Sequence, residues 1–266
     1  MNKNGFTLVE LIMAISIGLV IIAAVYALSE MGQRSSASIS QKVVTQQDAR
    51  AVLDLMAMEI RMASYNPSGK DNSTGNEIWV DKDGVAIAAA NNKKFMKGIQ
   101  IAKTNEIMIE MDLHGDAAAS NPDGFIKCSQ SNEVIHYKFD SATKTISRIT
   151  NCGINATDTQ VILGGAGSDT MVRNDAAPAV NLFTYWGPDI DHPDASGNCA
   201  DVDITDKVSS NVAATAEKWI PQIRQVIITI VADNERPDAT SKQTRRMTYS
   251  TGVTVRNHVL SPPISN

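Results

Sequence analysis

Hydrophobic residues are concentrated near the N-terminus of the chain. From Leu11 to Leu28 there are 18 residues without a charge, and Ser16 is the only clearly polar side chain among them. A helix of this length reaches about 27 Å at 1.5 Å per residue, close to the thickness of the hydrocarbon core of a bilayer. No second run of this length occurs in the chain. The pattern predicts one membrane-spanning helix at the N-terminus, with the rest of the chain outside the membrane.

The helical pattern continues beyond the apolar run. Residues 29–64 contain no proline and a single glycine, and the first strong helix breaker is the stretch from Tyr65 to Gly69. We therefore expect one helix from about Thr7 to Ser64. Its second half carries an apolar stripe at spacings of three and four that would face a core: Val52, Leu53, Met56, Ile60 and Ala63. The charged Asp54, Glu59 and Arg61 are expected on the other faces.

After this helix the hydrophobic period changes toward alternation, which is typical of strands. Hairpins are expected where two such runs flank a short polar turn, and the two longest runs lie near the C-terminus. A helix followed by antiparallel strands predicts an α+β head. The expected strands are residues 77–80, 98–102, 106–113, 133–139, 145–150, 181–186, 223–232 and 246–255.

The start of the chain allows three interpretations. A secretory signal peptide would use Lys3 as its basic region and Val25-Tyr26-Ala27 as its cleavage site. A simple signal anchor is the second interpretation. The third is a segment that is cut before its apolar run, so that the run stays with the mature protein. Glu10 counts against the first, because a charge inside an apolar segment is costly.

The stretch Gly5-Phe6-Thr7-Leu8-Val9-Glu10 resembles the processing signal of type IV prepilins and pseudopilins. The resemblance implies cleavage by a prepilin peptidase between Gly5 and Phe6, followed by N-methylation of Phe6. It also implies that Glu10 pairs with the N-terminal amine of a neighbouring subunit during assembly. An anion there is favoured by the dipole of the helix, and a carboxylate in an apolar setting needs a partner. Cleavage would remove the leader, residues 1–5.

The remaining chain is expected to divide into three parts. Residues 6–28 would form the transmembrane and filament-core helix, residues 29–66 its amphipathic continuation in the periplasm, and residues 67–266 a β-rich globular head. The head resembles minor pilins of the PilW type, and also the J-type minor pseudopilin of type II secretion. The two long C-terminal strands carry this resemblance best.

The resemblance implies a non-enzymatic structural subunit that primes pilus assembly and sits in a tip complex. Its partners would be other minor pilins, the major pilin, the prepilin peptidase and the assembly platform of the inner membrane. It would span the bacterial inner membrane once, with its head in the periplasm, and later reach the pilus at the cell surface. The alternatives are a type II secretion pseudopilin and a tip adhesin.

Composition supports a globular head and narrows its chemistry. The formal net charge is −5, which argues against a nucleic-acid partner, and aromatic residues make up only 5% of the chain. No two of the four histidines are spaced as metal ligands. The sequence contains no nucleophile elbow, phosphate-binding loop or dinucleotide fingerprint. No cofactor is expected, apart from calcium.

The chain has three cysteines, Cys128, Cys152 and Cys199. Export would place them in an oxidising compartment. Cys128 and Cys152 bracket the expected hairpin of residues 133–150, which favours a disulfide between them, and a bond between Cys152 and Cys199 is the alternative.

An acidic loop follows the strand expected at 181–186. Asp189, Asp191 and Asp194 place oxygen ligands close together in its sequence, which suits calcium. The spacing is not that of an EF-hand, so a solvated polar loop is the competing interpretation.

Overall fold

The computed structural model describes residues 7–67, 98–114, 126–130, 132–165, 170–210, 213–234 and 246–259, together with Pro122, Gly124, Gly167 and Ser168. The leader (residues 1–5), Phe6 and the strand expected at 77–80 lie outside the described residues.

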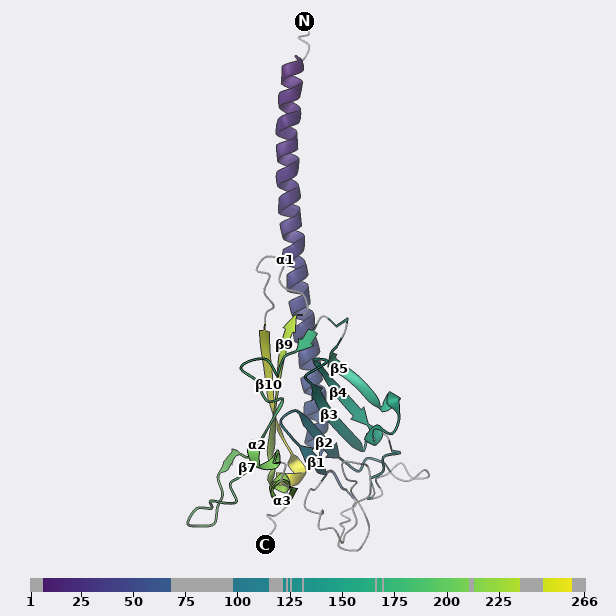
Figure 1. Cartoon of the computed structure of the whole chain (residues 1–266), viewed down its shortest axis with the longest axis vertical. Coiled ribbons are helices and arrows are strands. Elements are labelled where there is room, and N and C mark those ends of the chain that lie inside the picture. The colour runs from purple at the N-terminus through teal and green to yellow at the C-terminus, as the bar shows by residue number, and fades with distance from the viewer. Residues whose placement is uncertain are drawn as a thin grey trace.

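A single helix, α1 (Leu8–Met62), forms the long axis of the molecule and projects far beyond the head (Figure 1). It has 55 residues and runs through its glycines without a break. It ends two residues earlier than expected. Ala63 adopts an extended conformation and Ser64 a positive φ of 64°, which lets the Ser64 amide donate a 2.8 Å hydrogen bond to the carbonyl of Glu110. The chain therefore turns out of the helix at this point, and its backbone hydrogen-bonds to the head.

The described part of the head contains two sheets, and every strand pair in it is antiparallel. The first sheet has the order β1-β2-β3-β4-β5, which is also the order of its strands along the chain. Such a meander needs only short connections. Its strands are β1 (Ile99–Ala102), β2 (Glu106–Glu110), β3 (Val134–Asp140), β4 (Thr145–Thr150) and β5 (Thr159–Gly164).

The second sheet has the order β10-β9-β7-β8, and β6 pairs with the end of β9. Its long central pair is in continuous register from Arg246 opposite Asp233 to Thr254 opposite Gln225. The strands are β6 (Thr170–Val172), β7 (Phe183–Pro188), β8 (Asp201–Asp203), β9 (Gln225–Asn234) and β10 (Arg246–Thr254). Three short helices accompany this sheet: α2 (Thr205–Val208), α3 (Ala213–Trp219) and α4 (Arg256–Val259).

The α+β prediction is confirmed, and the long strands lie within a few residues of the expected ranges. The short strands β5, β6 and β8 were not predicted. β6 and β8 have three residues each, too few to show an alternating pattern. β5 exposes three of its six residues at its start, so its sequence lacks alternation as well.

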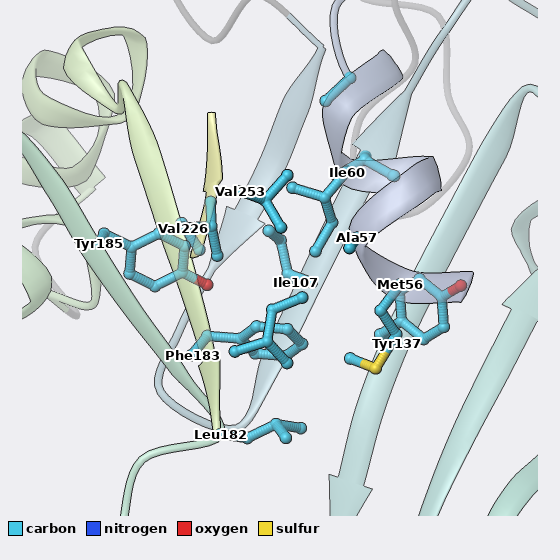
Figure 2. Packing of buried hydrophobic residues seen from close by; sticks show 14 of the residues in the cluster. Met56, Ala57, Ile60, Ile107, Tyr137, Leu182, Phe183, Tyr185, Val226 and Val253 are labelled. Atoms are coloured by element: carbon cyan, nitrogen blue, oxygen red, sulfur yellow. The ribbon is translucent and has the colours of Figure 1, made fainter. Parts of the chain in front are cut away.

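The core lies where the two sheets meet the second half of α1 (Figure 1). Met56 and Ile60 of the helix are fully buried, and they lie between Tyr137 of the first sheet and Val253 of the second (Figure 2). All five residues of the predicted stripe belong to this cluster. Each fully buried large apolar side chain contributes about 1.5–3 kcal/mol. One face of the helix therefore joins both sheets into a single core.

Glu59 was expected on an outer face of α1, and that prediction is wrong. Its carboxylate is buried against the first sheet, where Arg148 of β4 donates hydrogen bonds of 2.7 and 3.2 Å to Oε1. The hydroxyl of Tyr137 also donates to Glu59. Burial, and then the negative charge of Glu59, raise the pKa of Tyr137, so this hydroxyl stays a proton donor. The charge of Glu59 is buried because it is neutralised by its partners.

The C-terminal helix α4 fastens the end of α1. Asn257 donates a 2.9 Å hydrogen bond to the carbonyl of Ala63. The buried ring of His258 lies between the Ser64 hydroxyl, 2.8 Å from Nε2, and the carbonyl of Ile223, 3.0 Å from Nδ1. The last described element thus holds the point at which the helix turns into the head.

The Glu59–Arg148 pair gives a test of this docking. We expect Arg148→Ala to lower the free energy of unfolding of the head by about 3–5 kcal/mol, because it leaves a buried carboxylate without its cation. Arg61→Ala, on the exposed side of the same helix, should change it by less than about 0.5 kcal/mol. Denaturant unfolding of the detergent-solubilised chain measures both. Equal effects of the two substitutions would contradict a role for the buried pair.

Candidate functional site

The start of α1 is closed by a reciprocal cap between Thr7 and Glu10. The Thr7 hydroxyl accepts a 3.3 Å hydrogen bond from the Glu10 amide. In return, Glu10 Oε2 accepts 3.0 Å hydrogen bonds from the Thr7 amide and from the Thr7 hydroxyl. This capping box satisfies amide groups that the first turn of a helix leaves without partners. It also fixes the Glu10 carboxylate at the positive end of the helix dipole.

The two oxygens of the Glu10 carboxylate differ. Oε2 takes part in the cap, whereas Oε1 makes no hydrogen bond to any described residue. The side chain is exposed. Its geometry therefore leaves one carboxylate oxygen available to a cation from outside the chain while the other stabilises the chain's own helix.

The first half of α1 projects beyond the described part of the head (Figure 1), and its large apolar side chains are exposed. Leu8, Val20 and Leu28 are each about 70% exposed. By length and composition the helix can cross a membrane, and none of its most apolar window is buried within the chain. Water is an unfavourable environment for such a surface, so this half of the helix requires lipid or other apolar helices around it.

The N-terminus carries a recognisable motif. Residues 1–26 match the prokaryotic N-terminal methylation motif. No curated protein and no solved structure shows significant similarity to the chain. The motif indicates a type IV pilin or pseudopilin, a class of structural subunits rather than enzymes, and the long apolar helix followed by antiparallel sheets has a pilin-like architecture. It implies processing by a prepilin peptidase and assembly with other pilins.

Gly5 and Phe6, the residues expected to flank the cleaved bond, lie outside the described residues. Glu10 is described, and it meets Thr7, which was not predicted to have a role. The signal for this pair was present in the sequence: Thr7-Leu-Val-Glu10 directly before an apolar run is the pattern of a capping box.

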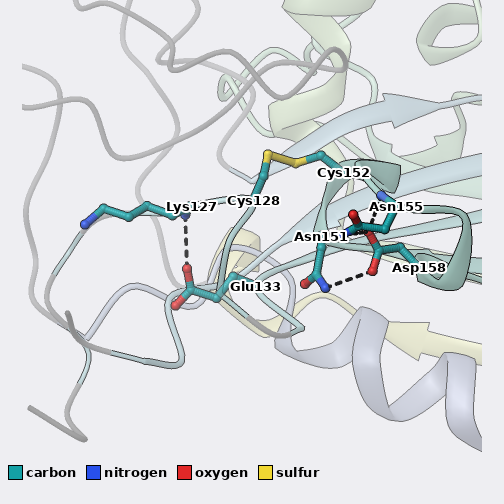
Figure 3. The surroundings of a disulfide bond; sticks show 7 residues. All are labelled: Lys127, Cys128, Glu133, Asn151, Cys152, Asn155 and Asp158. Atoms are coloured by element: carbon teal, nitrogen blue, oxygen red, sulfur yellow. Dashed lines mark hydrogen bonds between the residues drawn. A yellow bond between two sulfur atoms is a disulfide. The ribbon is translucent and has the colours of Figure 1, made fainter. Parts of the chain in front are cut away.

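The structure contains a disulfide between Cys128 and Cys152, with the Cα atoms 5.3 Å apart (Figure 3). Cys199 is a free, partly exposed thiol on the acidic loop. Just after Cys152, Asp158 accepts hydrogen bonds from the Asn155 amide, 2.7 Å, and from the Asn151 side chain, 3.2 Å. The disulfide and these bonds fix the irregular segment between β4 and β5.

Glu133 supports the other side of the disulfide (Figure 3). Its carboxylate accepts backbone hydrogen bonds from Leu113, His114 and Lys127 at 2.9–3.2 Å. Burial raises the pKa of Glu133, although these three amides oppose the shift. The carboxylate therefore serves as a backbone anchor for the segment that carries Cys128.

The aspartates of the acidic loop do not converge. Asp189 contacts His192 at 3.0 Å, and Asp194 accepts 2.7 and 2.8 Å hydrogen bonds from the amides of Asn198 and Ser196. Asp191 instead pairs with two lysines, of α2 and α3, at 3.4 and 2.7 Å. Within the described residues, no group of three or more His, Cys, Asp or Glu side chains is arranged to hold a metal ion.

The two lysines that pair with Asp191 also contact an aromatic ring. The Nζ atoms of Lys207 and Lys218 lie 5.4 and 5.7 Å from the centre of the Trp219 ring. Such cation–π contacts stabilise by about 0.5–1 kcal/mol each at exposed sites. The negative charge of Asp191 therefore attaches the acidic loop to α2 and α3 through these two lysines.

The contribution of the disulfide to stability can be tested by substituting Cys128 and, as a control, the free cysteine Cys199. Cys128→Ser should lower the free energy of unfolding by roughly 3 kcal/mol, because the bridge closes a loop of about 24 residues and restricts the unfolded chain. Cys199→Ser should leave it nearly unchanged. Unfolding of both variants under non-reducing conditions provides the measurement, and a comparable loss in Cys199→Ser would argue against the Cys128–Cys152 pairing.

Proposed function

We propose that this protein is a minor type IV pilin of the PilW type, which helps to prime pilus assembly and occupies a tip complex. The observation that carries the proposal is the combination of the methylation motif with a helix whose first half is apolar and exposed on all sides. A helix of that kind is suited first to the membrane and then to a bundle of similar helices. The two-sheet head adds bulk, which suits an accessory subunit better than an abundant one.

In this proposal the precursor is cut between Gly5 and Phe6, and residues 1–5 are removed. The Phe6 amine then carries the positive charge of the new N-terminus, and methylation preserves it. Residues 6–28 anchor the subunit in the inner membrane, residues 29–66 continue the helix into the periplasm, and residues 67–266 form the head. The subunit later passes into the pilus with other minor pilins and the major pilin at the assembly platform.

The Glu10 carboxylate would set the register between neighbouring helices. Oε2 stays on the helix cap, and Oε1 receives the Phe6 amine of an adjacent subunit. In an apolar surrounding the two charges need each other, because an isolated charge there is strongly unfavourable. A shift by one helical turn would separate them, so the pair selects one alignment.

This register role predicts a specific defect for Glu10→Ala. We expect normal membrane insertion and a loss of incorporation into pili of about tenfold or more, since truncating one partner of a buried charge pair costs about 2–5 kcal/mol. Glu30→Ala removes a partly exposed glutamate on the same helix, which pairs with Arg34, and should assemble normally. Immunoblots of sheared pili and of membranes measure both quantities. Normal incorporation of Glu10→Ala would refute the register role.

A deletion strain separates the priming function from its alternatives. Loss of all surface pili, restored by the wild-type chain, supports priming. Normal pili that fail to attach would instead identify a tip adhesin, and normal pili with defective protein secretion would identify a pseudopilin of type II secretion.

A further inference from the structure

The head-bound part of α1 carries a second apolar stripe, on the side that faces away from the core. Met58 is 55% exposed, and Val44 and Met62 are each 37% exposed. We call this set the outer seam. Its members are Val44, Ala51, Leu55, Met58 and Met62.

The outer seam has the spacing of a coiled coil. Val44, Ala51 and Met58 follow one another at intervals of seven, and Leu55 and Met62 each lie four residues after a member of that series. Apolar residues that alternate at spacings of four and three form the seam along which two helices wrap around each other. The core-facing stripe with Met56 and Ile60 occupies a different face. The helix therefore has one apolar face that is buried in its own head and another that stays partly exposed.

One position of the outer seam is charged. Asp48 lies four residues after Val44 and three before Ala51, which is a seam position, and its side chain is exposed. Asp48 makes no ion pair with any described residue. In a parallel pair of identical chains two such carboxylates would face each other, and like charges at a seam are unfavourable. A partner with a cation at this level would satisfy Asp48 instead.

We propose that the outer seam docks a parallel helix from a different subunit of the same filament, one that places a lysine or arginine opposite Asp48. This inference rests on the proposed function, because subunits that are anchored by the same N-terminal motif enter the filament with their helices in one direction. The seam extends from Val44 to Met62, 19 residues or about 27 Å of helix, which is between two and three heptads. Asp48 determines which partner helix binds, and the apolar residues supply most of the surface area that binding buries.

A photo-crosslinking amino acid in the full-length chain, expressed in its own host, tests the seam. It is placed at Met58 in the outer seam, at Val20 in the bare half of α1, and at Val161 on β5. Val161 is 57% exposed and thus matches Met58 in accessibility. Mass spectrometry of the crosslinked peptides then identifies the partner segment.

The expected result is that the probe at position 58 links to the N-terminal helix of another chain that carries the methylation motif, and that the probe at position 161 does not. Asp48→Lys should reduce this crosslink about tenfold or more, through like-charge repulsion with the partner's cation. Asp206→Lys makes the same change of charge at an exposed site on the head and should leave it unchanged.

The probe at Val20 separates failure of the seam from failure of the proposed function. If position 20 links to another prepilin-type helix and position 58 does not, the seam is overturned and the proposed function stands. If neither position links to such a helix, both are overturned. A crosslink from position 58 to residues 44–62 of a second copy, or to another subunit's head, overturns the choice of partner.

Discussion

Burial of one face of α1 between two antiparallel sheets is the contact on which the rest of the head depends. The sheets meet through the helix, since Met56 and Ile60 pack against Tyr137 on one side and Val253 on the other. Without the helix, the inner faces of both sheets would expose apolar side chains to water. The same helix extends from the head as a bare apolar rod, so the stability of the head and the direction of the rod are set by one element.

Polar contacts determine how the helix enters the head. Glu59 reaches Arg148 and Tyr137 in the first sheet, and the turn after the helix is held by Glu110 and by α4. Apolar packing is non-directional and would tolerate some sliding of the helix, whereas these buried bonds hold only in one arrangement. At the other end of α1, Thr7 and Glu10 close the helix with a cap. The helix is thus closed by a local cap at its start and held by the head at its end.

The charges of the head serve mainly to hold its irregular segments in place. Asp158 and Glu133 each accept amide hydrogen bonds beside the disulfide, and Asp191 draws two lysines onto Trp219. A covalent bridge together with such local contacts suits a domain that works outside the reducing cytoplasm. Several groups on α1 have no partner among the described residues: the apolar first half, one oxygen of Glu10, and Asp48 in the outer seam. The helix is thus the part of the molecule that is built for contact with other chains.

The sequence by itself determined the long helix, its apolar first half, the inner stripe and the order of the long strands, because each depends on a local period of hydrophobic residues. It also contained the Thr7–Glu10 cap, which lies within one turn. The tertiary structure alone decided that Glu59 is buried, since its partners lie 78 and 89 residues away along the chain. It likewise decided the short strands β6 and β8, which exist only because β9 and β7 provide a neighbour to pair with. The tertiary structure also decided that the aspartates of the acidic loop lie apart, because Asp191 forms ion pairs with lysines of two later helices. The local period of hydrophobic residues carries no information about contacts between distant segments, and such contacts determine where the charged side chains of Glu59 and Asp191 lie.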